Sequence, residues 1–293
     1  TYTDAKVIYK SIADSLDAAI AKINAGAANT NVVPLGSADI MFGGNTTSWK
    51  KLANTIKLRI LVRGNGKVTF SNSTFSSDGF LTTDALINPG YTRDNGKQNP
   101  KWNTWGWGYT GSSGTKSWMP STFSKTFYDG IKLTDNGRGK AVYYQFPTTP
   151  TNQLGYEGVS VVSSPEGTFW FPSTSRVGTS AGNSVGVLKG PNAGLPVITA
   201  SESYFIQAEA ALKGIISSTT AAAAFSNGIT ASFKYLYMLP DGSTSGNPTA
   251  DAATYLTDNA SSYLVNYGLA TSDAQRLEAI ITQKWVALNF VNS

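Results

Sequence analysis

The sequence predicts a mainly α-helical protein in which helical hairpins are interrupted by a large, loop-rich insertion. Amphipathic helical periodicity is confined to residues 1–63 and 199–293. The region between them, 64–198, is rich in Gly, Pro, Ser, Thr and aromatic residues and contains only short candidate strands. We therefore expect one domain over 1–293, made of a helical scaffold and a separable insertion.

Two helices are expected before the insertion. The first covers residues 4–24, and its apolar residues recur at helical spacing: Val7, Ile8, Ile12, Leu16, Ala19, Ile20 and Ile23. The second covers residues 48–63 and ends at Gly64. Its inner stripe carries Trp49, Leu52, Ala53, Ile56 and Ile60, and its outward residues are Lys50, Lys57 and Arg63. The two helices should pack on each other.

Three more helices are expected after the insertion. The capping-box sequence Thr199-Ala-Ser-Glu202 opens the first, and a second follows over 221–234. Another box, Ser272-Asp-Ala-Gln275, opens the last helix, which places Trp285 on its core face. Paired helices with alanine-rich packing faces predict tetratricopeptide-like hairpins stacked as a right-handed solenoid.

The insertion should contain short strands and most of the tryptophans. Residues 141–146 and 158–162 are the candidate strands. Five of the seven tryptophans lie in the insertion: Trp102, Trp105, Trp107, Trp118 and Trp170. This concentration of aromatic rings outside the helical periodicity separates a scaffold from a possible binding surface.

The segment Lys101-Trp-Asn-Thr-Trp-Gly-Trp-Gly-Tyr109 is the first candidate for a binding site. Indoles alternating with glycine and small polar residues can cover the flat face of a sugar ring or a nucleobase. The alternative is that the rings fill a loop-rich region that lacks aliphatic residues. If the segment is extended, Trp105 and Trp107 point the same way and Trp102 the other way, so we expect Trp105 and Trp107 to face the ligand.

Several further residues complete the candidate site. Tyr109 and Asn103 belong to the same segment, and Trp118 and Trp170 are second choices elsewhere in the insertion. Side chains able to form hydrogen bonds with vicinal hydroxyls surround the segment: Arg93, Asn95, Gln98, Asn99, Lys101 and Asn103. For any one of these polar residues, a solvated loop position is the simpler explanation.

Composition excludes several function classes. Cysteine and histidine are absent, which removes thiolate nucleophiles, Ser-His-Asp triads, disulfides and histidine-containing metal sites. The net charge of +5 comes from scattered Lys and Arg, so a nucleic-acid partner is not expected. No stretch approaches the ~20 apolar residues of a membrane span.

Catalytic, metal and cofactor sites are not expected either. The glycine-rich pieces around 106–114 lack the strand, helix and Gly-Lys-Ser/Thr context of a phosphate loop. No EF-hand spacing is present. A glycosidase needs two carboxylates flanking a cleft, and no recognisable pair stands out among the acidic residues of the insertion: Asp84, Asp94, Asp129, Asp135, Glu157 and Glu166.

Four segments, in order and at matching spacing, resemble the SusD/RagB family of outer-membrane glycan-binding lipoproteins. The first runs from Asp39-Ile-Met-Phe-Gly-Gly-Asn45 through Trp49 to Arg63. The second is Thr134-Asp-Asn-Gly-Arg138 followed by Ala141-Val-Tyr-Tyr144. The other two are the helical sequences over 204–214 and 280–288.

The resemblance implies a tetratricopeptide-like scaffold that docks on a SusC-like TonB-dependent transporter, with the ligand site in the insertion. Such a protein does no chemistry, binds oligosaccharide or polysaccharide and passes it to the transporter. The resemblance also implies a fragment: the family's lipidated N-terminal cysteine, its first repeat and its C-terminal segment are not in this chain. A peptide-binding or purely protein-interaction module of the same transporter system is the alternative.

Overall fold

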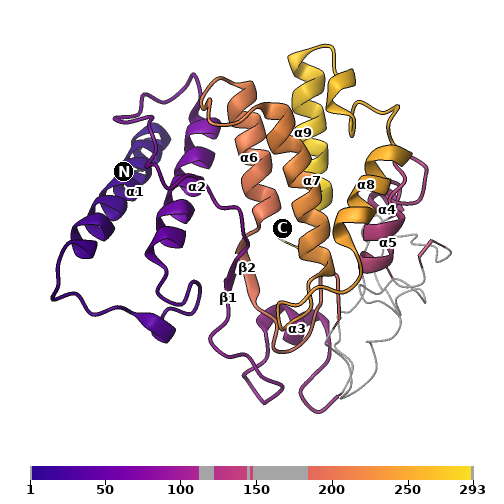
Figure 1. Cartoon of the computed structure of the whole chain (residues 1–293), viewed down its shortest axis with the longest axis horizontal. Coiled ribbons are helices and arrows are strands. Elements are labelled where there is room, and N and C mark those ends of the chain that lie inside the picture. The colour runs from indigo at the N-terminus through magenta and orange to yellow at the C-terminus, as the bar shows by residue number, and fades with distance from the viewer. Residues whose placement is uncertain (1, 112–121, 144–145, 148–183, 292–293) are drawn as a thin grey trace.

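The computed structural model describes residues 2–111, 122–143, 146–147 and 184–291, and long helices dominate it (Figure 1). These helices are α1 (Ala5–Ala27), α2 (Thr46–Gly64), α6 (Ala200–Leu212), α7 (Ala221–Tyr237), α8 (Pro248–Asp258) and α9 (Asp273–Leu288). They stand side by side: α1 packs on α2, α2 on α6, α6 on α7 and α9, and α7 on α8. The predicted mainly helical fold built of paired helices is confirmed. In the part of the chain that is described, no helix combines the length and apolarity needed to span a bilayer.

The first hairpin is formed by α1 and α2, close to the predicted bounds. Side-chain oxygens cap both helices: Asp4 accepts from the N–H of Lys6, and Asn45 from the N–H of Ser48. The predicted apolar face of α1 is only partly right, because Ile8 and Ile12 are 44% and 38% exposed. The covered face of α1 carries Ala13 and Ile20, since α2 is the helix on which α1 mainly packs.

Lys57 corrects the predicted outer face of α2. Its side chain is fully buried rather than outward, and its Nζ lies 2.7 Å from Asp17 Oδ1 on α1 and 2.8 Å from the Thr74 carbonyl. A buried ammonium is tolerated only when it is paired and hydrogen-bonded. The ion pair therefore joins α1 to α2, and the hydrogen bond to Thr74 joins α2 to the chain that follows it.

The C-terminal helices begin where the capping boxes predict. Thr199 Oγ1 accepts from the N–H of Glu202, and Ser272 Oγ from the N–H of Gln275. The structure also contains α8, which was not among the predicted helices although Asn247 caps it and Pro248 occupies its first turn. Trp285 lies at the edge of the core rather than inside it, with 38% of its surface exposed.

Two paired strands bracket most of the predicted insertion, residues 64–198. Strand β1 (Ala85–Ile87) pairs antiparallel with β2 (Leu195–Ile198), and Ile87 lies opposite Leu195. Between them lie the short helices α3 (Pro100–Trp105), α4 (Thr122–Lys125) and α5 (Asn136–Val142). The candidate strand over 141–146 is wrong at its start, because Ala141 and Val142 end α5. The candidate strand over 158–162 lies outside the described residues. Single-turn 3₁₀ helices occur at Gly36–Ala38 and Tyr267–Leu269.

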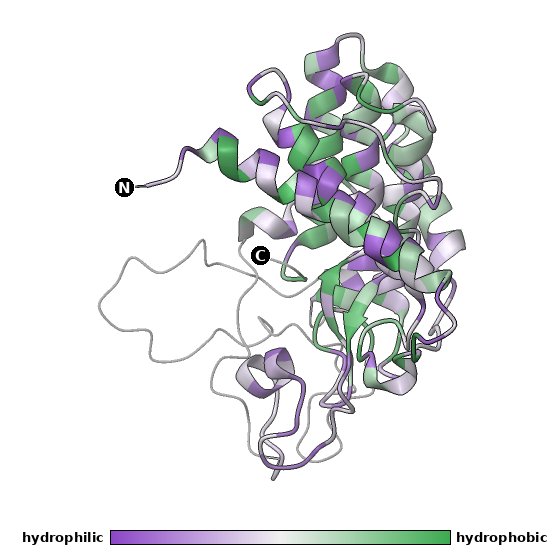
Figure 2. Cartoon of the chain, turned by 90° about the vertical axis from the view of Figure 1, so that its left-hand side faces the viewer, coloured by the Kyte–Doolittle hydropathy of each residue, from purple (hydrophilic) through white to green (hydrophobic). Residues whose placement is uncertain are grey.

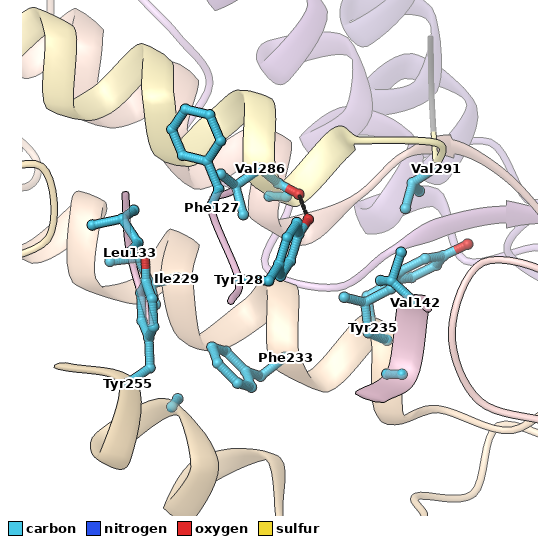
Figure 3. Close-up of a cluster of buried hydrophobic side chains, with 14 of the residues drawn as sticks. Phe127, Tyr128, Leu133, Val142, Ile229, Phe233, Tyr235, Tyr255, Val286 and Val291 are labelled. Carbon is cyan, nitrogen blue, oxygen red and sulfur yellow. Dashed lines mark hydrogen bonds between the residues drawn. The ribbon is translucent and has the colours of Figure 1, made fainter. Parts of the chain in front are cut away.

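Part of the insertion belongs to the main hydrophobic core. Phe127 and Tyr128 pack among side chains of α7, α8 and α9, and the Tyr128 hydroxyl donates to the Val286 carbonyl at 3.3 Å (Figure 3). Arg138 of α5 is fully buried between the rings of Phe233 and Tyr255. These contacts hold residues 127–138 of the predicted insertion against the helical scaffold.

Candidate functional site

The tryptophan segment, residues 101–109, begins as a helix and not as the extended strand that the sequence suggested. The side-chain oxygen of Asn99 caps α3 by accepting from the N–H of Trp102 at 2.9 Å, and Pro100 occupies the first turn. Residues three apart share one side of a helix, so Trp102 and Trp105 do not alternate as in a strand. The prediction that Trp102 points opposite to Trp105 assumed an extended strand, so it does not hold over 102–105.

Trp102 lies in the hydrophobic core. Its side chain is 1% exposed, and Gly106 closes the helix directly over it. A Cβ at Gly106 would stand 2.8 Å from the Trp102 ring, so only glycine allows the chain to fold back at this point. The Trp102 indole therefore supports the segment and offers no face to a ligand.

Trp105, Trp107 and Tyr109 form a gradient from half-buried to exposed. Trp105 and Trp107 pack against the main core cluster with part of each side chain at the surface, and Tyr109 is 45% exposed. A turn closed by the Gly111 N–H bonding to the Gly108 carbonyl at 2.9 Å presents Tyr109. Of these three rings, Tyr109 is therefore the most accessible to a ligand.

The predicted polar residues divide into anchors and surface groups. Gln98 and Asn99 are each 5% exposed and bond within the protein: Asn99 Nδ2 donates to the Ala193 carbonyl at 2.8 Å. Gln98 Nε2 donates to Asn103 Oδ1 at 3.1 Å and to the Trp107 carbonyl at 3.2 Å. Asn95 and Asn103 are exposed, so they are the amides of this group that a ligand can reach.

Two largely buried lysines tie the segment and its surroundings to the scaffold. Lys101 Nζ donates to the carbonyls of Phe290 and Val291 just after α9, and burial lowers the pKa of Lys101 to about 8. Lys189 Nζ donates to the carbonyls of Tyr235 and Met238 at the end of α7. Burial lowers the pKa of Lys189 to about 7, although Asp84 opposes the shift. Each lysine thus donates to carbonyls at or just beyond the C-terminal end of a scaffold helix.

Two second-choice candidates, Trp118 and Trp170, lie outside the described residues. They remain predictions.

The described carboxylates of the insertion have structural partners. Asp84 Oδ1 accepts from the N–H of Ala200 at the start of α6, and Asp135 pairs with Arg138 at 2.5 Å. Asp129 pairs with Lys125 at 2.8 Å, and Asp94 accepts from the Thr92 hydroxyl. Over the described ranges no three Asp or Glu side chains gather as a metal site would require. Glu157 and Glu166 lie outside those ranges.

A second aromatic surface was not anticipated. Phe123 and Trp285 are 47% and 38% exposed, with ring centroids 6.1 Å apart, and Lys132 Nζ lies 4.6 Å from the Phe123 ring centroid. The 3.6-residue period placed Trp285 in the core, because a helical pattern does not show where the neighbouring elements end. Nothing in the sequence around Phe123 signalled its position beside α9.

A polar hollow of about 150 Å³ lies apart from the tryptophan segment, between α5 and α8. Asp251, Asp258 and Lys140 line it together with Tyr237, whose hydroxyl donates to Asp251. None of its lining residues belongs to 98–111, so it is separate from the candidate site.

A family model described as SusD-like, starch-binding and associating with the outer membrane matches residues 1–293. A SusD homologue from Bacteroides fragilis aligns with a TM-score of 0.64 at 20% identity, covering 99% of this chain and 61% of its own. A SusD homologue from Bacteroides uniformis gives 0.62 at 21% identity, covering 99% and 58%. A chitin-binding SusD homologue from Flavobacterium johnsoniae gives 0.60 at 21% identity, covering 98% and 58%. This chain thus spans about three fifths of these structures, and no curated protein matches it.

Proposed function

This chain belongs to the SusD-like family of starch-binding proteins that associate with the outer membrane, and we propose that it is a surface receptor that binds oligosaccharide or polysaccharide and delivers it to a SusC-like TonB-dependent transporter. The family consists of non-catalytic binding proteins. The receptor therefore works by affinity and presentation, and the ligand leaves chemically unchanged.

The observation that carries the proposal is the graded exposure of Trp105, Trp107 and Tyr109 on an anchored segment. Sugar rings present flat C–H faces that stack on aromatic rings, and their hydroxyls bond side-chain amides such as that of Asn103. Rings fixed before binding lose little conformational freedom when the ligand arrives. Anchoring by Asn99 and Lys101 on the N-terminal side supports such preorganisation.

The test is glycan binding by alanine variants, measured by calorimetry after an array screen. Malto-oligosaccharides and chito-oligosaccharides are the first ligands, because the family is described as starch-binding and one similar structure as chitin-binding. Each stacked ring contributes on the order of 1 kcal/mol, so Trp105→Ala and Trp107→Ala should each weaken binding roughly 5- to 10-fold. Trp285→Ala is the matched control: it removes a partly exposed indole from α9 and should leave glycan affinity unchanged.

The second candidate function is a peptide-binding or purely protein-interaction module of the same transporter system. The exposed Phe123 and Trp285 favour it, because exposed aromatic side chains are enriched at protein interfaces. Under this alternative no glycan binds, whereas oligopeptides or the transporter do, and Trp285→Ala weakens that binding more than Trp105→Ala does. Melting temperatures of all variants separate loss of a contact from loss of the fold.

A further inference from the structure

Gln98 joins the two halves of the tryptophan segment. Its Nε2 donates to the side-chain oxygen of Asn103 on α3 and to the backbone carbonyl of Trp107 beyond Gly106. Because a carbonyl can only accept, the contact with Trp107 fixes the amide so that its nitrogen faces the segment. One buried amide therefore sets where the chain after α3 lies relative to α3 itself.

Two polar atoms of the same residues, Gln98 and Trp107, are left without a hydrogen bond within the described ranges. Gln98 Oε1 and the indole Nε1 of Trp107 are both buried, and neither has a hydrogen-bond partner among the described residues. Burying an unbonded acceptor or donor is unfavourable and offsets much of what a hydrogen bond contributes. The arrangement around Gln98 is thus a poor way to stabilise the fold, although it holds Trp107 in a defined place.

We propose that Gln98 is a positioning residue that holds Trp107 and Asn103 in the geometry required for ligand binding, rather than a residue retained for stability. The proposal rests on the proposed function, because the ligand is what makes this geometry useful. Gln98 is 5% exposed and acts through the residues that it holds, not by contact with the ligand. Unsatisfied groups kept at a binding site, at a cost in stability, are a known feature of functional regions.

The experiment compares Gln98→Met with Gln207→Met. Gln207 is a matched control, because its amide is also buried, at 8% exposure, and donates to Ser203 within α6, away from the segment. The ligand-free readout is acrylamide quenching of tryptophan fluorescence, with and without Trp107→Phe in the same chain. The second readout is affinity for whichever glycan the wild type binds, and the third is the melting temperature.

Gln98→Met should increase quenching, and the increase should vanish in the Trp107→Phe background. Affinity should fall roughly 2- to 10-fold, because the Trp107 side chain would then lose its freedom of movement when the ligand binds instead of beforehand. The melting temperature should stay within about 2 °C of the wild type. Gln98→Asn keeps the amide but is one methylene shorter, so it should also increase quenching. It replaces Gln98→Met in the comparison if that variant does not fold.

Unchanged quenching in both Gln98 variants overturns the proposal, and so does an equal increase in Gln207→Met. A large fall in melting temperature in both Gln98 variants also overturns it, since Gln98 then acts through stability. If the wild type binds no glycan, the proposed function fails separately, and the quenching comparison alone decides whether Gln98 holds Trp107.

Discussion

Trp102 and Tyr109 belong to one short segment, yet 1% of the first side chain and 45% of the second are exposed. Truncating a buried indole removes its transfer free energy and leaves a cavity, so Trp102→Ala should destabilise the fold by about 3–5 kcal/mol. Tyr109→Ala should change the free energy of unfolding by no more than about 0.5 kcal/mol, because few packed atoms depend on it. Urea denaturation of the two variants measures the difference. Similar stability losses in both would contradict the placement of these rings.

Lys189 gives the protein a pH dependence whose sign follows from its burial. Its pKa is about 7 in the folded state against 10.5 for the exposed side chain, so between these values the unfolded chain binds the extra proton. Stability should therefore rise with pH across that window, by up to ~1.4 kcal/mol per pH unit from this group. Lys101, with a folded pKa of about 8, should add to the rise above pH 8.

The measurement is the slope of unfolding free energy against pH from 7 to 9, in wild type and Lys189→Met. The variant also loses the bonds to the Tyr235 and Met238 carbonyls, which lowers stability at every pH. The slope reports only the titration of Lys189, because losing those bonds lowers the unfolding free energy by the same amount at every pH. A variant slope as steep as that of the wild type would show that Lys189 does not titrate in this window.

Asp39 organises the turn that precedes α2. Its carboxylate accepts from the N–H groups of Met41, Phe42 and Gly44 and from the Trp49 indole at 2.8 Å. Burial alone would raise the pKa of Asp39, but these bonds outweigh it and lower the pKa to about 2. The contribution of Asp39 to stability is therefore present above about pH 4 and lost as pH falls towards 2.

Asp39→Ala should destabilise the protein by roughly 2–4 kcal/mol at pH 7, because three backbone donors and the indole lose a charged acceptor. Trp49→Phe is the control, because it removes only one of the four hydrogen-bond donors to Asp39, the indole. It should therefore reduce the pH dependence of the unfolding free energy far less than Asp39→Ala does. Denaturant unfolding at pH 7 and pH 3 measures both. The assignment fails if Asp39→Ala unfolds with the same pH dependence as the wild type.

At the scale of the elements, α6 and α7 approach closely because α7 carries a glycine at the contact. A Cβ at Gly228 would lie 2.8 Å from the Phe205 ring, closer than real side-chain contacts allow. Gly228→Ala should therefore destabilise the fold by about 1–3 kcal/mol through overpacking. Gly26→Ala in α1 should instead be neutral or stabilising by up to ~1 kcal/mol, because its Cβ meets only Val32, at 3.9 Å, and alanine favours the helix. Thermal unfolding that ranks the two variants the other way would contradict this packing.

The long scaffold helices could be predicted because capping and periodicity are local signals. Thr199 and Ser272 cap helices where the sequence suggested, whereas the buried side of α1 depended on which helix covers it. Lys57 was misplaced for the same reason: its partner Asp17 lies on another helix. The conformation of the candidate site was harder to predict, because the helix that begins at Pro100, after the Asn99 cap, is too short to show a helical period in the sequence.

At the scale of the whole molecule, the structure joins the insertion to the scaffold at several places. Strands β1 and β2 hold its base, Lys101 and Lys189 bond the ends of α9 and α7, and Tyr128 enters the core (Figure 3). Figure 2 shows hydrophobic and hydrophilic residues alternating along the helices, as expected of helices that bury one face. The aromatic segment is thereby carried on a packed helical body, as a receptor with fixed rings requires.

The most direct test of the receptor account is a calorimetric titration of malto- and chito-oligosaccharides into the wild type and into a Trp105→Ala/Tyr109→Ala double variant. The account predicts saturable binding of at least one glycan by the wild type. It also predicts a loss of affinity of roughly 10-fold or more in the double variant, from two stacked rings at about 1 kcal/mol each. Equal affinity of both proteins, with unchanged melting temperatures, would contradict the claim that these rings hold the ligand.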